Sequence, residues 1–337
     1  MNTQTKILVT GGAGFIGSHL VDELIELGHK VVVLDDLSGG FKENVNSKAL
    51  FIEGSINDAQ LVQALFTEHK FDYVYHLAAY AAEGLSHFIK SFNYHNNLLG
   101  SINLINASVN HDVKCFVFTS SIAVYGANQL PMLETTTPRP EDSYGIAKYA
   151  IELELKACKE MFGLDYIIFR PHNVYGERQN IGDKYRNVLG IFMNQIMQDK
   201  PITIFGDGTQ KRAFTYVKGV TQAMAQAINK QEAYNHVFNI GADEPYSVND
   251  IVKYVFEAME KEVEVKYLEA RNEVHTAYSD HSKVRLLLAY EDAHSLAEGV
   301  KRMATWAKKH GARETKVFSN IEILKNLPAS WRIKDEK

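Results

Sequence analysis

Thr10-Gly11-Gly12-Ala13-Gly14-Phe15-Ile16-Gly17 follows the apolar run Ile7-Leu8-Val9 and leads into a segment with helical periodicity, Phe15 to Leu27. Three of its glycines, Gly11, Gly14 and Gly17, recur at every third residue. Glycine permits a tight turn and a close approach of the backbone to a ligand. The free N–H groups at the start of the following helix can then bind an anion such as a phosphate. The stretch therefore predicts a strand, a phosphate-binding turn and a helix, in that order.

The first half of the chain continues this alternation of short apolar runs and longer helical patterns. The expected strands are Ile7–Thr10, Val31–Leu34, Phe51–Glu53, Tyr73–Leu77, Cys115–Phe118 and Tyr166–Phe169. The expected helices are Phe15–Leu27, Asp58–His69, Asn93–Val109 and Ser143–Met161. Such alternation indicates a parallel sheet with helices on both faces, and continuously apolar strands are typical of strands buried on both sides. We predict an α/β fold: a Rossmann-type doubly wound parallel sheet with a smaller, partly interleaved C-terminal lobe.

Composition excludes several other classes of protein. The 337 residues include 36 basic and 41 acidic side chains, for a net charge of −5, which disfavours a nucleic-acid-binding surface. Cys115 and Cys158 are the only cysteines, too few for a disulfide framework or a cysteine-based zinc site, and no metal site is expected. No apolar stretch reaches the roughly 18 residues of a membrane span. The N-terminal segment also lacks the pattern of a signal peptide, so we expect a cytoplasmic protein.

Asp35 ends the second expected strand, at about the distance beyond the glycines where an acidic residue binds the adenosine ribose of a dinucleotide. Together with the strand before the glycine loop and the helix after it, Asp35 indicates dinucleotide binding. Asp35 and Asp36 should repel a 2′-phosphate, so NAD is favoured over NADP. The expected cofactor contacts of this region are Gly11, Gly14, Phe15, Ile16, Gly17 and Asp35.

Tyr144 and Lys148 lie four residues apart in the expected helix that begins at Ser143, so their side chains share one helical face. A free tyrosine has a pKa near 10 and is a poor base at neutral pH. A nearby ammonium group and a positive nicotinamide ring would lower that pKa, and the phenol could then exchange a proton with a substrate hydroxyl. The spacing alone is common on helices. The run Thr119-Ser120-Ser121 strengthens the hypothesis, because it places hydroxyls just after a strand, where open α/β sheets bind ligands.

These segments, with His76-Leu77-Ala78-Ala79 and Arg170-Pro171-His172-Asn173-Val174-Tyr175-Gly176, resemble the extended short-chain dehydrogenase/reductases. Within that superfamily the chain is similar to NAD-dependent nucleotide-sugar epimerases of the UDP-glucose 4-epimerase type, from Lys6 to about Trp331. The resemblance implies an NAD-binding domain over residues 1–170, with return segments from about 215–245. It implies a nucleotide-sugar-binding lobe and a C-terminal tail over residues 171–337.

The resemblance also implies roles for particular residues. Tyr144 is expected to be the catalytic base and acid, Lys148 to bind the nicotinamide ribose and tune Tyr144, and Ser121 to hydrogen-bond the reacting sugar oxygen, with Ser120 beside it. Further cofactor contacts are expected at Ser55, Ile56, Leu77, Ala78, Ala79 and Asn97. Ser55 departs from the pattern, because many members have an aspartate there whose carboxylate meets the adenine.

Substrate binding is expected from the second half of the chain. The resemblance implies that Asn173 contacts the sugar diphosphate and that Arg212 and Arg271 clamp it, since a guanidinium group can bind a phosphate with two donors. Asn187 and Val188 are expected to line the nucleotide pocket. A position between Arg271 and Asp280 limits the size of the sugar substituent in this family. Alignment on Asp280 assigns this role to Ala277, and alignment on Arg271 assigns it to Tyr278.

The residues after Ser121 distinguish between reactions. Dehydratases of this family carry an acid there, because dehydration needs extra proton transfers; this chain has Ile122 and Ala123. The expected reaction is NAD-dependent 4-epimerisation of a UDP-sugar (UDP-glucose or UDP-galactose, or the N-acetyl or uronic acid analogue) by transient oxidation at C4. The alternatives are another nucleotide-sugar epimerase or oxidoreductase of the same family, and a non-catalytic NAD-binding protein. The resemblance implies a homodimer, in contact through the helices at Asn93–Val109 and Ser143–Met161. Charge and hydropathy predict no nucleic-acid or membrane partner.

Overall fold

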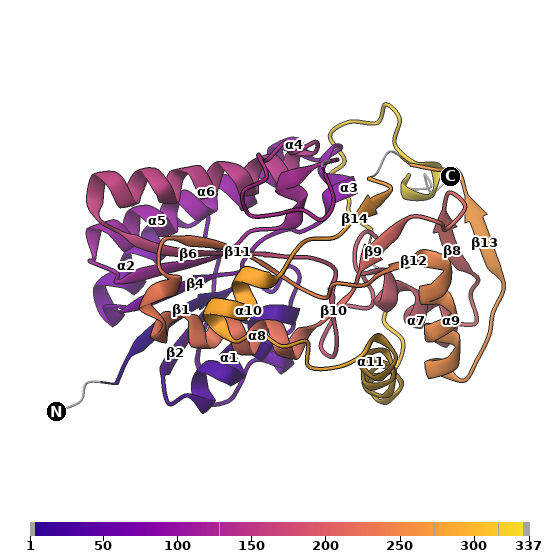
Figure 1. Cartoon of the computed structure of the whole chain (residues 1–337), viewed down its shortest axis with the longest axis horizontal. Coiled ribbons are helices and arrows are strands. Elements are labelled where there is room, and N and C mark those ends of the chain that lie inside the picture. Colours follow the sequence, from indigo (N-terminus) through magenta and orange to yellow (C-terminus); the bar gives the residue numbers. More distant parts are fainter. Residues whose placement is uncertain (1–3, 128, 272–273, 316, 333–337) are drawn as a thin grey trace.

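A seven-stranded parallel sheet forms the larger lobe of the molecule, and a smaller lobe adjoins it at one end (Figure 1). The computed structural model describes residues 4–127, 129–271, 274–315 and 317–332. Residues 1–3, which begin the segment searched for a signal peptide, lie outside this description. The strand order is β11 (His236–Ile240), β6 (Asp165–Pro171), β5 (Cys115–Thr119), β4 (Tyr73–His76), β1 (Lys6–Thr10), β2 (Lys30–Asp35) and β3 (Leu50–Glu53).

Every neighbouring pair in this sheet is parallel, so the carboxyl ends of the strands meet at one edge. The strand order reverses at β1: β2 and β3 lie on one side of it, and β4, β5 and β6 lie on the other. Doubly wound dinucleotide-binding sheets have the same order. The predicted Rossmann-type fold class is confirmed. β11 adds a seventh strand from the second half of the chain, parallel to β6 and paired from His236 with Ile167 onwards.

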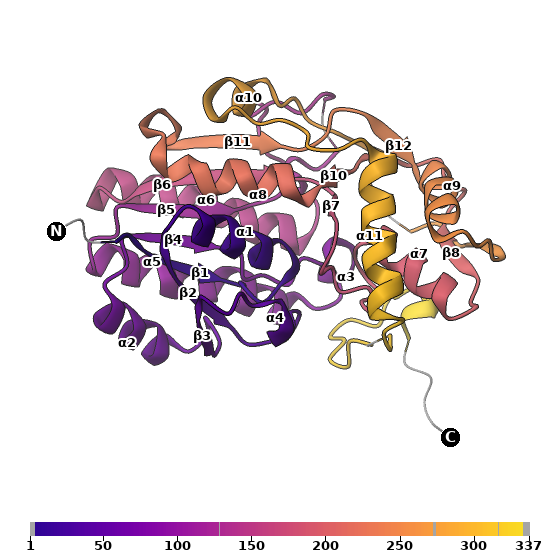
Figure 2. The ribbon, with the colours of Figure 1, turned by 90° about the horizontal axis from the view of Figure 1, so that it is seen from below.

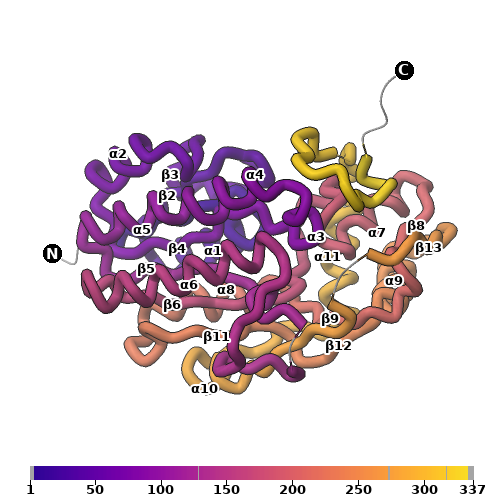
Figure 3. Tube along the Cα trace, turned by 90° about the horizontal axis from the view of Figure 1, so that it is seen from above, coloured from indigo at the N-terminus to yellow at the C-terminus, as the bar shows by residue number. Residues whose placement is uncertain are grey.

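Helices cover both faces of the sheet, and this explains why its strands are apolar throughout. Ile7 and Val9 of β1 pack on one face and Leu8 on the other, and all three side chains are buried. One face carries α1 (Phe15–Glu26), α8 (Val217–Gln226) and α10 (Ser282–Leu288) and is turned towards the viewer in Figure 2. The other carries α2 (Ala59–His69), α5 (Gly100–Asn110) and α6 (Ser143–Phe162), which Figure 3 shows from above.

The helix expected at Asn93–Val109 begins earlier and is interrupted. The chain forms α4 (Lys90–Tyr94), a π-helical turn at His95–Leu99, and then α5. A π-turn inserts an extra residue into the helix and is frequent at functional sites. Here it contains Asn97, whose buried side chain hydrogen-bonds the backbone of Tyr80. Helical periodicity in the sequence does not distinguish such a turn from regular α-helix.

The smaller lobe has a separate apolar core. It is built from α7 (Val188–Met197), α9 (Val248–Met259), α11 (Leu296–His310) and the parallel strand pair β8 (Ile202–Phe205) and β13 (Val265–Leu268). Two small sheets lie between the lobes. One pairs β7 (Val174–Tyr175) with β10 (Thr215–Tyr216), and the other has the order β12 (Pro245–Ser247), β9 (Lys211–Ala213) and β14 (Thr276–Ala277).

The C-terminal segment returns to the junction of the two lobes, above α3 (Glu83–Ser86) in Figure 3. Leu327 and Trp331 are buried there against Leu85 and Tyr185. The segment therefore docks across the junction of the two lobes through apolar contacts, as its composition indicates. Within the described part of the chain, none of the helices combines the length and apolar character needed to cross a membrane.

Candidate functional site

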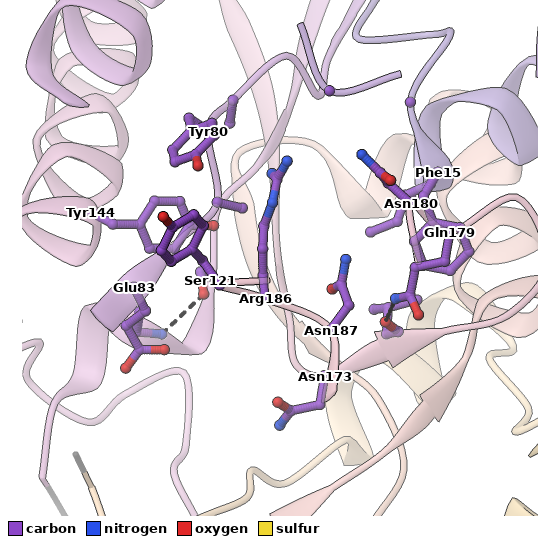
Figure 4. A pocket seen from close by; sticks show the side chains of 18 of the residues that line it. Phe15, Tyr80, Glu83, Ser121, Tyr144, Asn173, Gln179, Asn180, Arg186 and Asn187 are labelled. Atoms are coloured by element: carbon purple, nitrogen blue, oxygen red, sulfur yellow. Dashed lines mark hydrogen bonds between the residues drawn. The ribbon is translucent and has the colours of Figure 1, made fainter. Parts of the chain in front are cut away.

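A cavity of about 560 Å³ lies between the carboxyl ends of the sheet strands and the smaller lobe. One wall consists of the glycine loop and the segments that follow β2, β4 and β5. The opposite wall consists of the segment that follows β6, the start of α7, and residues from 203 to 274. Figure 4 shows Tyr144, Ser121 and Tyr80 on one side of this space and Asn173, Asn187 and Asn180 on the other, with Arg186 between them.

The glycine loop is packed so closely that its glycines cannot be exchanged for larger residues. A Cβ at Gly17 would overlap the carbonyl oxygen of Gly11, and one at Gly11 would lie 2.7 Å from the backbone nitrogen of Ala78. Gly11 also has a φ of 74°, which favours glycine. Gly14 begins α1, and no side chain caps that end of the helix. Gly14, Phe15, Ile16 and Gly17 all line the cavity, so the helix N-terminus faces it, an arrangement that fits a pyrophosphate.

Asp35 stands at the end of β2, in the wall of the same cavity. Its two carboxylate oxygens accept hydrogen bonds from the backbone N–H groups of Ala13 (3.0 Å) and Leu37 (2.8 Å). Burial raises the pKa of this carboxyl, while the backbone hydrogen bonds act in the opposite direction. The side chain is thus fixed beside the glycine loop, where an acid that binds ribose hydroxyls belongs. The residues of this wall fit a bound dinucleotide.

Four of the six remaining expected cofactor residues also line the cavity: Ile56, Leu77, Ala78 and Ala79. The other two, Ser55 and Asn97, are not among the described residues that line it. The Ser55 hydroxyl accepts a hydrogen bond from the backbone N–H of Asn57 within a turn. Asn97 instead accepts from the N–H of Tyr80 (2.8 Å) and donates to its carbonyl oxygen (3.0 Å), which fixes Tyr80 in the cavity wall.

Tyr144 and Lys148 occupy the first two turns of α6 and point towards the cavity. Asp142 caps the helix by accepting a hydrogen bond from the N–H of Gly145. The Lys148 ammonium donates to the carbonyl oxygen of Thr119 at 2.8 Å and lies 5.8 Å from the centre of the Tyr144 ring. Ser121, at the end of β5, lines the same part of the cavity. The structure thus brings together the three residues expected to be catalytic.

Burial dominates the protonation of this group. It raises the pKa of the Tyr144 phenol above its usual value, although the Ser121 hydroxyl lowers it. It also lowers the pKa of Lys148 to about 7, against an opposing effect of Glu152. The pKa of Tyr144 is therefore raised, whereas the sequence predicted that Lys148 would lower it. Burial of the phenol destabilises its charged form more than the neighbouring groups stabilise that form.

Glu152 continues the helical face of Tyr144 and Lys148 by one more turn, and the sequence analysis overlooked it. Its carboxylate is fully buried, accepts a hydrogen bond from the Ser120 hydroxyl at 2.6 Å, and is paired with Arg170. Arg170 also donates to the Tyr125 hydroxyl. This network fixes the Ser120 hydroxyl, and Ser120 lines the cavity beside Ser121. The four-residue spacing after Lys148 was a signal that could have identified it.

On the facing wall, Asn173, Asn187, Val188, Arg212 and Arg271 all line the cavity. Asn173 and Asn187 both have positive φ, 41° and 67°, which asparagine tolerates better than most residues. Arg212 donates to the carbonyl oxygens of Val274 and His275. The guanidinium of Arg271 lies 4.7 Å from the ring centre of Phe205 and 5.8 Å from that of Trp331. The C-terminal segment therefore supports one of the two arginines.

Neither candidate for the size-limiting position is among the described residues that line the cavity. Ala277 pairs with Arg212 across β14 and β9 and packs against Val124 and Met132. The carbonyl oxygen of Tyr278 accepts a hydrogen bond from the N–H of Met132. Val274 lies in the wall instead.

Arg186 is a second residue that the sequence analysis overlooked. Burial opposes its charge, but the Asp183 carboxylate and nearby tyrosines together raise its pKa above the usual value. Arg186 immediately precedes Asn187 and Val188, which were expected to line the nucleotide pocket. This position next to two expected pocket residues could have identified it from the sequence. Among the described residues, no group of His, Cys, Asp and Glu side chains forms a candidate metal site.

Comparison with known proteins gives consistent matches. The family model described as "NAD dependent epimerase/dehydratase family" matches residues 7–241. A putative UDP-glucose 4-epimerase of Methanocaldococcus jannaschii is 37% identical over 307 residues, which cover 90% of this chain and 99% of that protein. The crystal structure of UDP-glucose 4-epimerase from Thermotoga maritima with UDP-glucose is 39% identical, with a TM-score of 0.87 over 91% of this chain and 99% of that one. UDP-glucuronic acid 4-epimerase from Bacillus cereus, solved with UDP-glucuronic acid and NAD, is 30% identical, with a TM-score of 0.83 over 91% and 100% of the two chains.

Proposed function

The chain belongs to the NAD-dependent epimerase/dehydratase family, and from this premise we propose that it catalyses the 4-epimerisation of a UDP-sugar. Family membership confirms the predicted resemblance, the NAD cofactor and the enzyme class, a nucleotide-sugar epimerase. The observation that carries the proposal is that Tyr144, Lys148 and Ser121 lie together in the lining of one cavity.

The glycine loop and Asp35 would hold the cofactor. When bound, NAD supplies an acceptor and donor for the hydride at C4 of the sugar, and its oxidised ring adds a positive charge that favours the phenolate of Tyr144. Tyr144 removes the proton of the sugar 4-hydroxyl and later returns it to the 4-keto sugar. When protonated, Lys148 places a positive charge close to Tyr144, and Ser121 hydrogen-bonds the oxygen that gains and loses the proton.

The facing wall supports the choice of substrate class. Arg212 and Arg271 would bind the diphosphate, and Asn173, Asn187 and Val188 would contact the sugar diphosphate and the nucleotide. Ile122 and Ala123, which follow Ser121, carry no group that transfers a proton, and Ala123 lies in the cavity wall. Their chemistry favours epimerisation over dehydration.

The test is NMR of the purified protein incubated separately with UDP-glucose, UDP-N-acetylglucosamine and UDP-glucuronate, without added NAD. We expect the 4-epimer of at least one sugar, with no net consumption of NAD. The preferred sugar identifies the substituent that the cavity accepts. If none of the three sugars is converted, even with NAD supplied, the proposal is wrong.

The assembly proposed here is a homodimer in contact through the π-turn region and α6. Leu99, Ile146 and Leu153 expose between 42% and 50% of their surfaces on these neighbouring elements. Light scattering should give the mass of two chains for the wild type and of one chain for Leu153→Asp. Leu286→Asp is the control, because Leu286 is 82% exposed on α10, which covers the opposite face of the sheet. A monomeric wild type would contradict this assembly.

A further inference from the structure

The side chain of Arg186 comes from the segment before α7 and extends into the cavity, between the group that contains Tyr80 and the group that contains Asn187 (Figure 4). Its Nε donates to a carboxylate oxygen of Asp183 at 2.7 Å, and its guanidinium carbon lies 4.7 Å from the centre of the Tyr80 ring. A Cβ built on Gly39 would lie 3.2 Å from its Nη2. Gly39 belongs to the loop that follows β2 and Asp35. The guanidinium therefore lies beside the cofactor loop of the other lobe.

The residues around Arg186 fix the orientation of its guanidinium group but do not occupy all of its N–H donors. Asp183 is held in turn by the backbone N–H of Tyr185 at 2.8 Å, and Asn97 holds the backbone of Tyr80. Only 17% of the Arg186 side chain is exposed. Among the described residues, its hydrogen-bond partner is Asp183, reached through Nε, so the Nη1 and Nη2 end of the planar fork is available to a ligand in the cavity that Arg186 lines. Two adjacent N–H donors of a guanidinium match two oxygens of a phosphate.

The charges of the cofactor wall show why such a donor is needed. Up to residue 81, the described residues that line the cavity include two carboxylates, Asp35 and Asp36, and no lysine or arginine. The N-terminus of α1 offers backbone donors and a partial positive charge, worth about half an elementary charge. A dinucleotide brings two negative phosphates to this acidic wall. Arg186 places a full positive charge beside this loop, at Gly39.

We propose that Arg186 is a diphosphate-binding residue that reaches from the smaller lobe to the pyrophosphate of NAD and helps to retain the cofactor. The inference rests on the proposed function, because it takes NAD and a UDP-sugar as the two ligands of the cavity. Both ligands contain a diphosphate. The position beside Gly39, on the cofactor wall, favours the dinucleotide, and binding measurements with separate probes distinguish the two sources.

The test compares wild type, Arg186→Gln and Arg186→Lys. The NAD retained through purification is quantified after acid release, and dissociation constants of NAD, ADP-ribose and UDP are measured by calorimetry on cofactor-depleted protein. Arg186→Gln should retain less NAD and bind both NAD and ADP-ribose about 10- to 100-fold more weakly, the usual effect of one lost hydrogen bond to a charged group. ADP-ribose tests the diphosphate without the nicotinamide. Arg186→Lys, which keeps the charge and loses the fork, should lie between the two.

Lys184→Gln is the matched control. Lys184 belongs to the same segment and also lines the cavity, but its ammonium donates to the carbonyl oxygen of Ser330. Its loss should change the affinity for NAD by no more than about threefold. UDP affinity should be unchanged in Arg186→Gln, and thermal unfolding should show that the variant is folded.

Three results would overturn the assignment: unchanged affinity for NAD and ADP-ribose, weakened affinity for UDP alone, or equal losses for all three ligands. A loss for UDP alone would mean that Arg186 binds the sugar nucleotide. These binding results do not depend on which sugar is converted. If the wild type epimerises no UDP-sugar while Arg186→Gln still weakens NAD binding, the proposed function fails and the assignment of Arg186 stands.

Discussion

The cofactor wall of the cavity is made of backbone and small residues, whereas the facing wall is made of long side chains supplied by loops. In the first, Gly11 and Gly17 bring backbone segments into direct contact. In the second, Arg212 and Arg271 are held by carbonyl oxygens and aromatic rings from distant parts of the chain. A wall made of closely packed backbone suits a ligand that does not vary, such as the cofactor. The side chains of the facing wall can be substituted without disturbing the sheet, so we expect the selectivity for the sugar to depend on this wall.

The largest expected effect is at Tyr144. Tyr144→Phe should lower kcat by about 10²- to 10⁴-fold, the usual contribution of a general acid–base group. NAD retention should be unchanged, because the glycine loop and Asp35 are untouched. Tyr149→Phe, on the same helix but packed against Val124 and Met132, is the control and should keep its activity. Undiminished turnover of Tyr144→Phe would show that the chemistry takes place elsewhere.

The glycine loop should not tolerate an added Cβ. Gly17→Ala should lower the free energy of unfolding by about 1–3 kcal/mol and reduce the NAD retained, because the new Cβ overlaps the Gly11 carbonyl. Gly84→Ala is the matched control: its Cβ would lie 3.4 Å from the Trp331 ring, an ordinary contact, within helix α3. Urea unfolding of both variants checks this. Equal stability of the two would contradict the steric account of the glycine loop.

The facing wall should be more sensitive to acid. His172 precedes Asn173 and is fully buried, with its Nε2 3.0 Å from Nε2 of His281 and its Nδ1 3.0 Å from the carbonyl oxygen of Ala213. Beyond His281 lies Asp243, which is also paired with Arg285. Burial lowers the pKa of His172 to about 3, with a further lowering by His281.

The unfolded state therefore binds more protons than the folded state between the ordinary histidine pKa of about 6.5 and the folded value. Stability contributed by a neutral His172 is present above pH 6.5 and falls as the pH decreases below it, by at most about 1.4 kcal/mol per pH unit. Urea unfolding between pH 7.5 and 5 should show this slope in the wild type and a shallower one in His172→Gln. Identical slopes would contradict the account.

The smallest effect is expected at Ala277. Because it packs against Val124 and Met132, Ala277→Val should cost about 1 kcal/mol of stability by overpacking. The ratio of kcat/KM for UDP-glucose over UDP-N-acetylglucosamine should stay within about twofold. A tenfold change in this ratio would show that Ala277 limits the size of the sugar substituent.

The sequence predicted the cofactor wall well because its structure is determined locally. A strand, three spaced glycines and Asp35 have one favourable arrangement, and the face shared by Tyr144 and Lys148 follows from helical geometry. Arg186 escaped prediction because its importance arises from contacts with Tyr80 and Gly39, more than a hundred residues away in sequence. The positions of Ala277 and Tyr278 depend on how β14 meets β9, and the π-turn around Asn97 depends on packing against Tyr80. Periodicity carries no information about such long-range contacts.

The central claim is that the sugar is oxidised and reduced at C4 within one cavity, and substrate deuterated at C4 tests it most directly. The preferred UDP-sugar, labelled with deuterium at C4, is incubated with the enzyme in ordinary water and the epimer is analysed by NMR and mass spectrometry. We predict that the product retains the deuterium at C4, because the hydride that leaves this carbon returns to it. Replacement of that deuterium by solvent hydrogen, or appearance of the label at another carbon, would contradict the account.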